Sequence, residues 1–387
     1  GEKLKNYIYL DNAATTYPKP EIVYERMDEC NRYLAVNAGR GSYELAKEAL
    51  ELMERTRYKL LKLAGAKDVA EVVFAASATV ACNEIIGGLN FTEYDVVYVS
   101  PYEHNAVART IFHHQKRVGF TVEELPLCED GTIDMELTAY QFSVKKPSYV
   151  FVTHMSNVTG YILPVDKILN MAKECGAVTV VDGSQALGLV PVDLKKLEAD
   201  YYVFAGHKNL YGPFGIGGFF IRHGNQLRSY IAGGTGSDSL NLDMPAGIAG
   251  LEAGSPNIVA VAGLEAALQV YEEQGCETFL EQEKQLTRFL CEELSGIEEV
   301  VTYLPPDESH VGIVACNIKG YQSADVGELL DEDYHIALRT GYHCAPYVHK
   351  HLKNEGYGGV MRISIGRYTT ADDIERLVKA VREIVGG

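Results

Sequence analysis

The sequence has no surplus of basic side chains and no long hydrophobic run. Its 387 residues include 35 Lys and Arg against 53 Asp and Glu, a formal net charge of -18. Nucleic-acid binders need clusters of Lys and Arg to neutralise phosphates, and here no basic run is longer than a pair. No stretch reaches the roughly 18 apolar residues that span a bilayer. We therefore expect no nucleic-acid or membrane partner, and a cytoplasmic protein.

Paired cysteine motifs are also missing. The eight cysteines contain no Cys-x-x-Cys spacing, which disfavours zinc ribbons and iron–sulfur sites. A long chain without a secretion signal usually keeps its thiols reduced, so most of these residues should be small buried hydrophobes. The eight are Cys30, Cys82, Cys128, Cys175, Cys276, Cys291, Cys316 and Cys344.

Between residues 70 and 222, short β-branched or aromatic runs alternate with amphipathic stretches. This alternation is typical of an α/β fold with a mainly parallel sheet and helices on both faces. Only HKNLYGPFGI separates the last two runs, so we expect at least one antiparallel pairing there. The seven predicted strands are 71–76, 95–100, 121–127, 148–154, 177–182, 201–205 and 217–222.

The flanking regions follow a different pattern. A helix is predicted over 42–64, with Ser42 as its N-cap and Gly65 as its stop. After residue 256 the pattern changes to an α+β mixture. We therefore expect a large domain over 17–256, and a small domain formed by 1–16 and 257–387. The elements predicted in this last part are helices 257–274, 277–294 and 371–384 and strands 311–318 and 360–365.

Two neighbouring predicted strands end in groups that suggest chemistry. Asp182 ends an apolar strand with Gln185 three residues later, and His207 and Lys208 follow the next strand. Asp182 could simply cap a following helix. However, open α/β sheets bind ligands at the carboxyl ends of their strands. A lysine that forms a Schiff base and a carboxylate that pairs with the pyridinium nitrogen are what pyridoxal phosphate requires.

Other predicted strand ends fit the same cofactor. Ala78 and Thr79 open a helix after the first strand, where backbone amides and the Thr79 hydroxyl could hold a phosphate. His104 could stack on the cofactor ring, and Asn157 with Gln185 could bind its phenolic oxygen. Each residue alone is more often a structural hydrogen-bonding group. Together they favour a pyridoxal phosphate site.

Several segments together resemble the class V aminotransferase-like enzymes of fold type I, and within them the cysteine desulfurase and selenocysteine lyase group. The resemblance extends from residue 9 to residue 384, and its motifs around Asp182, Lys208 and Cys344 are together highly specific. It implies a homodimeric pyridoxal phosphate enzyme whose larger domain binds the cofactor. The segments are YLDNAATT, AGRGS, EHNAV, SNVTGYILPV, VVDGSQALG, AGHKNLYGPFGIGG, LEAGSPN, RTGYHCAP and VMRISIGRYTT.

Cys344 differs from the other cysteines because it lies in RTGYHCAP and not on an apolar helix face. We expect it alone to be exposed and mobile. By the resemblance, its thiolate takes the sulfur of L-cysteine as a persulfide, releases alanine, and passes the sulfur to an acceptor protein or small thiol. Two alternatives stay open. Cys344 could be buried and inert, or it could bind a metal with His343, His349 and His351, although zinc sites usually have more regular spacing. We predict no metal.

The resemblance assigns further roles. Arg362 should bind the substrate carboxylate, because a guanidinium matches it in bidentate geometry. Arg367 is the weaker alternative, and Arg339 either assists or positions the Cys344 loop. Asn12 and Ala13 belong to an N-terminal segment that closes over the site.

Lys208 should carry the proton at the substrate, with His104 in acid–base steps. Thr235 matches a residue that reaches the phosphate in the neighbouring subunit, which implies composite active sites.

Three positions depart from the family pattern. Ala205 replaces a serine that contacts the phosphate, Val80 replaces an acidic residue, and Tyr342 replaces a histidine. These departures leave the substrate open among cysteine, selenocysteine, cysteine sulfinate and other β-substituted amino acids. A transaminase, or a non-catalytic sulfur-relay protein with the same fold, also remains possible. The sequence does not name the sulfur acceptor or the pathway.

Overall fold

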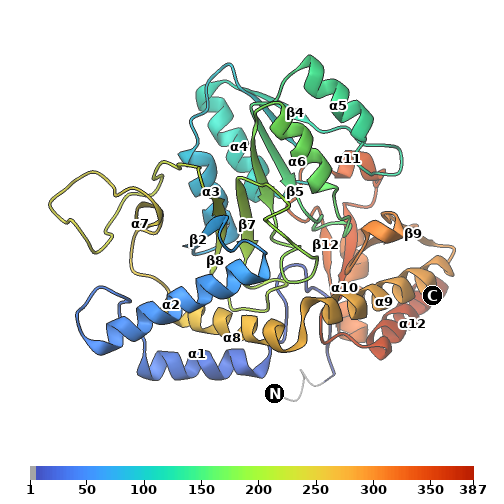
Figure 1. Ribbon diagram of the computed structural model, residues 1–387. Helices are drawn as coiled ribbons and strands as arrows, with labels where there is room; N and C mark the ends of the chain where they lie inside the picture. The colour runs from blue at the N-terminus through green and yellow to red at the C-terminus, as the bar shows by residue number, and fades with distance from the viewer. Residues whose placement is uncertain (1–5) are drawn as a thin grey trace.

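The computed structural model describes residues 6–387, so residues 1–5 of the predicted N-terminal segment lie outside the described part. Its centre is a seven-stranded sheet with the order β2-β8-β7-β6-β5-β3-β4 (Figure 1). Of these strands, β8 runs antiparallel to both of its neighbours and the remaining pairs are parallel. The α/β fold, the seven strands and the antiparallel pairing of the last two are thus confirmed. The strands are β2 (Ala70–Ala75), β3 (Val96–Val99), β4 (Thr121–Glu124), β5 (Tyr149–Thr153), β6 (Val178–Asp182), β7 (Tyr201–Ala205) and β8 (Gly217–Arg222).

Helices cover both faces of this sheet, which explains why its strands are apolar on both sides. Successive side chains of a strand point to opposite faces. Accordingly, Val150 and Val152 pack in one apolar cluster with α2, α5, α6 and α8, while Phe151 packs in another with α3 and α4. These helices are α2 (Glu44–Leu63), α3 (Ala78–Gly88), α4 (Asn105–Val118), α5 (Met135–Val144), α6 (Val165–Glu174) and α8 (Ile258–Gln274).

One detail of the predicted helix 42–64 is wrong. The helix begins at Glu44, its N-cap is Tyr43, and no side chain caps it. Ser42 therefore lies one residue outside the cap. A further helix, α1 (Glu21–Tyr33), packs along α8.

A second sheet of four antiparallel strands has the order β12-β13-β10-β9. Ile8 and Leu10 join its apolar cluster, because β1 (Ile8–Tyr9) pairs with β11 (Ile336–Ala337). The N-terminal segment thus packs with the C-terminal part of the chain. The strands are β9 (Val300–Thr302), β10 (Ile313–Ile318), β12 (Arg339–Gly341) and β13 (Val360–Ser364), and the helices are α9 (Cys276–Ser295), α10 (Ser323–Tyr334), α11 (His349–Leu352) and α12 (Ala371–Gly386).

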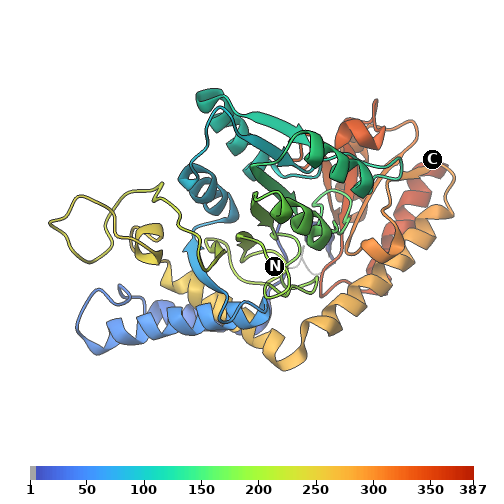
Figure 2. The ribbon, with the colours of Figure 1, turned by 45° about the horizontal axis from the view of Figure 1, so that its top comes forward.

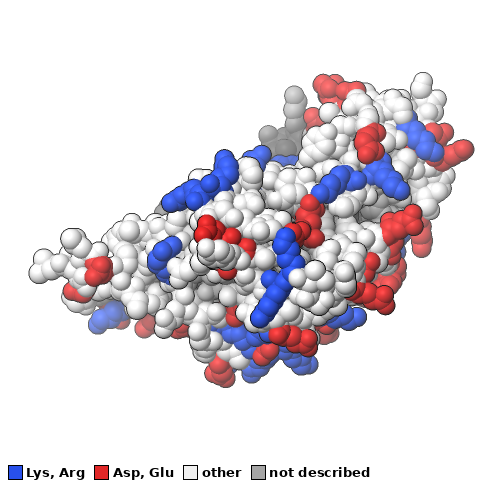
Figure 3. All heavy atoms as spheres, turned by 90° about the horizontal axis from the view of Figure 1, so that it is seen from above, with Lys and Arg blue, Asp and Glu red and all other residues white. Residues whose placement is uncertain are grey.

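Residues 223–247, between β8 and α7 (Ile248–Leu251), contain no helix or strand, and the later part of this segment projects from the body of the molecule (Figures 1 and 2). Leu240 and Leu242 in this segment are each 99% exposed. Acidic and basic side chains are mixed over the face seen in Figure 3. Within residues 6–387, no helix is both long and apolar enough to cross a bilayer.

Candidate active site

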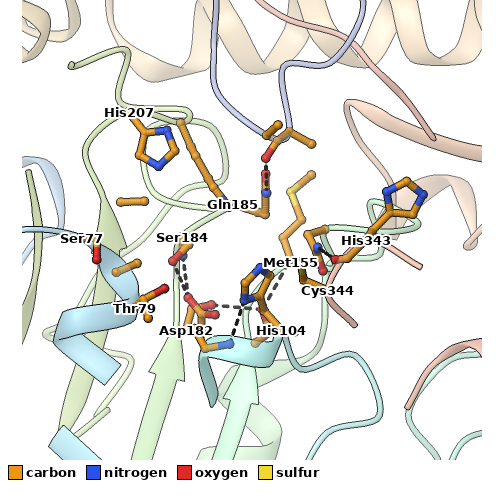
Figure 4. A pocket seen from close by; sticks show the side chains of 18 of the residues that line it. Ser77, Thr79, His104, Met155, Asp182, Ser184, Gln185, His207, His343 and Cys344 are labelled. Carbon is orange, nitrogen blue, oxygen red and sulfur yellow. Dashed lines mark hydrogen bonds between the residues drawn. The ribbon is translucent and has the colours of Figure 1, made fainter. Parts of the chain in front are cut away.

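One pocket collects most of the predicted site residues (Figure 4). It lies where the carboxyl ends of β5, β6 and β7 meet the N-terminal segment and the loop after β12. This is the edge at which open α/β sheets bind ligands. The predicted residues that line it are Ala13, Ala78, Thr79, His104, Asn157, Asp182, Gln185, His207, Lys208, Arg339, Cys344 and Arg362.

Asp182 is the last residue of β6 and is buried. Its Oδ1 accepts hydrogen bonds from the backbone N–H and the hydroxyl of Ser184, at 3.0 and 2.6 Å. Turns follow in residues 184–189, so Asp182 does not cap a helix. No described residue donates a hydrogen bond to Oδ2. Asp182 is therefore a fixed carboxylate with one oxygen available to a cationic ring nitrogen.

Lys208 follows β7 and reaches the same pocket. Burial lowers the pKa of its amine to about 8, with a further lowering by Arg362 and an opposing effect of Asp182. A desolvated lysine near its pKa is a good nucleophile and proton carrier. Thr16 fixes its backbone, because the Thr16 hydroxyl donates to the Lys208 carbonyl at 2.7 Å.

His104 is both a structural cap and a pocket residue. It is the N-cap of α4, and its Nδ1 accepts the backbone N–H of Ala106 at 2.9 Å. This bond places the ring proton on Nε2. Burial, and next the charge of Lys208, lower the pKa of His104 to about 4. The imidazole is therefore neutral at pH 7.

The start of α3 forms a cradle for an anion. Ser77 is the N-cap and its side chain accepts the N–H of Val80, while the first-turn amides of Ala78 and Thr79 have no partner inside the helix. A Cβ on Gly217 would come within 3.0 Å of the Ala78 nitrogen, so glycine keeps this cradle open.

His207 adds a buried Nδ1 that has no hydrogen-bond partner among the described residues. Burial lowers the pKa of His207 to about 4. Its neutral ring could donate to an anion. With the amides at the start of α3, Lys208 and Asp182, this orphaned group fits pyridoxal phosphate.

Asn157 and Gln185 each bind another part of the chain at the edge of the pocket. The Asn157 amide donates to the carbonyl of His343 at 2.8 Å, and the Gln185 amide donates to the carbonyl of Ala13 at 2.8 Å. Each amide keeps a second N–H that a ligand oxygen could accept.

Cys344 lies between β12 and α11 and its side chain is exposed, so it is not a buried, inert cysteine. His343 and Cys344 have φ values of +54° and +53°, a conformation that costs non-glycine residues energy. The loop is held by its backbone, because the Asn105 N–H donates to the Cys344 carbonyl at 2.6 Å. The prediction that Cys344 alone is exposed is wrong, since Cys128 in the turn after β4 is exposed too.

The metal alternative at this loop has little geometric support. His343 Nε2 lies 3.0 Å from the carbonyl of Val360, and His349 Nε2 lies 2.8 Å from that of Tyr342. Within residues 6–387, no three His, Cys, Asp or Glu side chains gather as metal ligands do. These imidazoles support the loop instead.

Arg362, in β13, is only 2% exposed. Its Nη1 donates to the carbonyl of Asn157 at 3.1 Å and its Nη2 to Asp11 Oδ1 at 3.0 Å. Arg339 Nε lies 3.8 Å from the other oxygen of Asp11. Arg367 does not line the pocket. Its guanidinium carbon lies 3.9 and 3.8 Å from the centroids of two aromatic rings, so it is not placed to bind the substrate carboxylate.

Two other predicted residues also lie away from the pocket lining. Asn12 is buried, and its amide donates to the carbonyl of Ser364 at 3.1 Å, which joins the N-terminal segment to β13. Thr235 lies in the projecting segment. Sequence reasoning did not single out Asp11, Met155 or Ser184. Asp11 and Ser184 lie inside the motifs YLDNAATT and VVDGSQALG, and Met155 directly precedes SNVTGYILPV.

Comparisons with known proteins agree with this geometry. The family model described as Aminotransferase class-V matches residues 8–377. The chain belongs to this family. A cysteine desulfurase of Escherichia coli O127:H6 is 32% identical over 97% of this chain and 93% of its own. The apo cysteine desulfurase of Thermococcus onnurineus NA1 has a TM-score of 0.91, with 32% identity over 98% of this chain and 95% of that one. An Escherichia coli cysteine desulfurase in an S-sulfonic acid form has a TM-score of 0.85, with 27% identity over 98% and 95%.

The predicted class V resemblance and fold type I architecture are thereby confirmed. Class V aminotransferases depend in general on pyridoxal phosphate, which is the group that the pocket fits. The family match over residues 8–377 includes both sheets and the Cys344 loop.

Proposed function

We propose that this chain is a pyridoxal phosphate-dependent cysteine desulfurase. L-cysteine and the Cys344 thiol give L-alanine and a Cys344 persulfide, so the sulfur leaves Cβ, bonds to Sγ, and the atoms balance without another reactant. The observation that carries this proposal is that Cys344, Lys208 and Asp182 line one pocket. The names of the relatives support the same activity.

The cofactor would be held by groups that the chain already orients. Lys208 would bind it covalently, Asp182 Oδ2 would face its ring nitrogen, and His104 would stack on its ring. The amides of Ala78 and Thr79, with His207, would hold its phosphate. When bound, the cofactor supplies an electron sink for the electrons left at the substrate Cα.

A second copy of the chain would complete the phosphate site. Thr235 lies in the projecting segment 223–247, away from the pocket of its own chain. We place it in the phosphate site of a homodimer partner. The apolar side chains of Leu240 and Leu242 are consistent with such a contact.

The substrate would be held and deprotonated by residues of two sheets. Arg362, assisted by Arg339, would hold its carboxylate, and the N-terminal segment at Ala13 would close over it. Lys208 would move the proton at Cα, because an amine with a pKa of about 8 exists in both forms near neutral pH. Cys344 Sγ would then attack the substrate sulfur.

Three further proposals concern the whole chain. The large domain comprises residues 17–256, and the protein is cytoplasmic. An acceptor protein or a small thiol takes the sulfur at the exposed Cys344 loop.

A substrate panel with alanine as the common product tests this function. Purified protein with the cofactor should form alanine from cysteine, and Cys344→Ala should reduce this rate by at least about a hundredfold. Cys128→Ala is the matched control, because Cys128 is the other exposed thiol but does not line the pocket. Its rate should equal that of the wild type.

Selenocysteine and cysteine sulfinate are included in the panel. Their leaving groups depart more readily, so Cys344→Ala should retain activity toward them. Equal activity of wild type and Cys344→Ala on cysteine would exclude the persulfide route. A protein that forms no alanine from any substrate, and stays colourless with the cofactor, would favour a non-catalytic relay.

A further inference from the structure

Ser184 contacts one oxygen of the Asp182 carboxylate twice. Its backbone N–H donates to Asp182 Oδ1 at 3.0 Å, and its hydroxyl donates to the same atom at 2.6 Å (Figure 4). Both residues line the pocket and are buried. Within residues 6–387, only Ser184 donates hydrogen bonds to this side chain, and both bonds reach Oδ1. The protein therefore binds one carboxylate oxygen and leaves the other for a ligand.

The backbone of this turn is held on the neighbouring strand. Gly183 separates the two residues, and its N–H donates to the carbonyl of Val203 in β7 at 2.8 Å. A Cβ at Gly183 would overlap the ring of Tyr202, so only glycine fits at this position. The turn is thus fixed on β7, and the Ser184 side chain is directed back toward Asp182.

Lys208 is a cation that attracts Asp182 within the same pocket. Burial lowers the pKa of the Lys208 amine to about 8, and the charge of Asp182 opposes this lowering. The last torsion of an aspartate side chain has a broad preference, so the carboxylate turns readily unless hydrogen bonds hold it. The Ser184 hydroxyl supplies such a bond, and a hydrogen bond to a charged group is stronger than one between neutral groups. It therefore opposes rotation of the carboxylate toward Lys208.

We propose that Ser184 is a positioning residue for the pyridoxal phosphate ring. Its hydroxyl fixes Asp182 through Oδ1 and so directs Oδ2 to the place where the ring nitrogen would lie. Because the effect passes through Asp182, it is confined to ligands that carry this nitrogen. A ligand without the nitrogen gains nothing from the orientation of Oδ2. The inference rests on the proposed function, which assigns Asp182 to the ring nitrogen.

Ser184→Ala tests this role, because it removes the hydroxyl and keeps the backbone N–H. The dissociation constant of pyridoxal phosphate for the cofactor-free protein, measured by calorimetric titration, should rise about tenfold. That of the deaza analogue, in which C–H replaces the ring nitrogen, should not rise. Ser184→Thr keeps a hydroxyl and should bind pyridoxal phosphate as the wild type does.

Ser143→Ala is the matched control. The Ser143 hydroxyl also donates at 2.6 Å, to the carbonyl of Tyr140, but Ser143 is exposed and does not line the pocket. Its removal should leave both dissociation constants unchanged. Ser184→Cys repeats the test if Ser184→Ala does not fold, because a thiol is a weaker donor than a hydroxyl. The same difference between the two ligands is expected.

Two results would overturn the proposal. If wild type and Ser184→Ala bind pyridoxal phosphate equally, the hydroxyl does not orient Asp182. If Ser184→Ala loses the same factor with the deaza analogue, the hydroxyl supports only the fold of the turn. Both titrations contain no amino acid substrate, so they do not depend on desulfuration. A protein that forms no alanine from cysteine refutes the desulfurase function, whereas either titration result above refutes the role of Ser184.

Discussion

Asp182 ends β6 and Lys208 follows the neighbouring strand β7, whereas Cys344 lies on an exposed loop between β12 and α11. The Asp182 carboxylate is buried and bound by Ser184. The Cys344 loop, by contrast, has two consecutive non-glycine residues with positive φ and docks through backbone carbonyls. The same pocket is thus built from a rigid half of buried strand ends and from an exposed loop with a strained backbone.

This difference matches the proposed roles of the two halves, which are cofactor binding and sulfur transfer. The groups that bind a cofactor work best when packing and hydrogen bonds fix their geometry. A thiol that receives sulfur inside the pocket and delivers it outside has to reach two places. The strained backbone at His343 and Cys344 lowers the cost of leaving the docked position. Three measurements test whether the two halves differ in this way.

The rigid half should control cofactor capture through the Lys208 amine. Its pKa of about 8 means that the neutral, reactive fraction falls about tenfold per pH unit well below pH 8. Covalent attachment of pyridoxal phosphate to the cofactor-free protein should therefore accelerate as pH rises toward 8, followed by visible absorbance. Asp182→Asn should shift the midpoint to lower pH, because Asp182 raises this pKa. Lys208→Ala should show no attachment, and a pH-independent wild-type rate would contradict the assignment.

Helix α9, which packs on the second sheet, contains a buried acid, Glu283. Burial raises its pKa from 4.5 to about 8, although Arg367 opposes this. Between about pH 4.5 and 8 the folded state holds a proton that the unfolded chain has lost. The free energy of unfolding should thus fall as pH rises, by up to about 1.4 kcal/mol per pH unit from this group.

Denaturant unfolding at several pH values measures this effect. Glu283→Gln should flatten the slope, because the amide does not titrate. Glu281 is an exposed acid two residues earlier in the same helix, so Glu281→Gln should keep the wild-type slope. Parallel profiles for wild type and Glu283→Gln would show that this carboxyl does not couple pH to stability.

The smallest effect is expected at the outer end of the Cys344 loop. Lys350 Nζ lies 2.6 Å from Glu124 Oε2, which links α11 to the end of β4. An exposed pair of this kind contributes about 0.2–1 kcal/mol. Glu124→Gln should therefore raise hydrogen exchange of the Asn105 amide, which donates to Cys344, by up to about fivefold.

The neighbouring pair supplies the control for this measurement. Glu123 binds Lys145 at 2.5 Å and does not contact the loop. Glu123→Gln should leave exchange at Asn105 unchanged. Equal acceleration in both variants would mean that the β4 end, and not the pair with α11, determines how firmly the loop docks.

Much of the rigid half could be predicted from the sequence, because local residue patterns determine where its strands begin and end. β-Branched runs of strand length gave the seven strands, and the polar residues directly after them fell at one sheet edge. The loop and the arginines were less predictable. Asp11 and Arg362 are far apart in the sequence and meet only through the pairing of the N-terminal segment with the second sheet. No local pattern distinguishes Arg362, which lines the pocket, from Arg367, which packs between aromatic rings.

The cysteines also show the difference between properties that follow from local sequence and properties that follow from tertiary packing. Composition and spacing showed that the eight thiols form no paired motif, and the motif around Cys344 predicted that this thiol is the reactive one. The exposure of Cys128, and the position of Cys344 with Lys208 in one pocket, became visible only in the folded chain. Strand and helix periodicity are local properties of a sequence. Exposure, ion pairing and the charge of a pocket depend on which distant segments pack together, so they appear only in the folded chain.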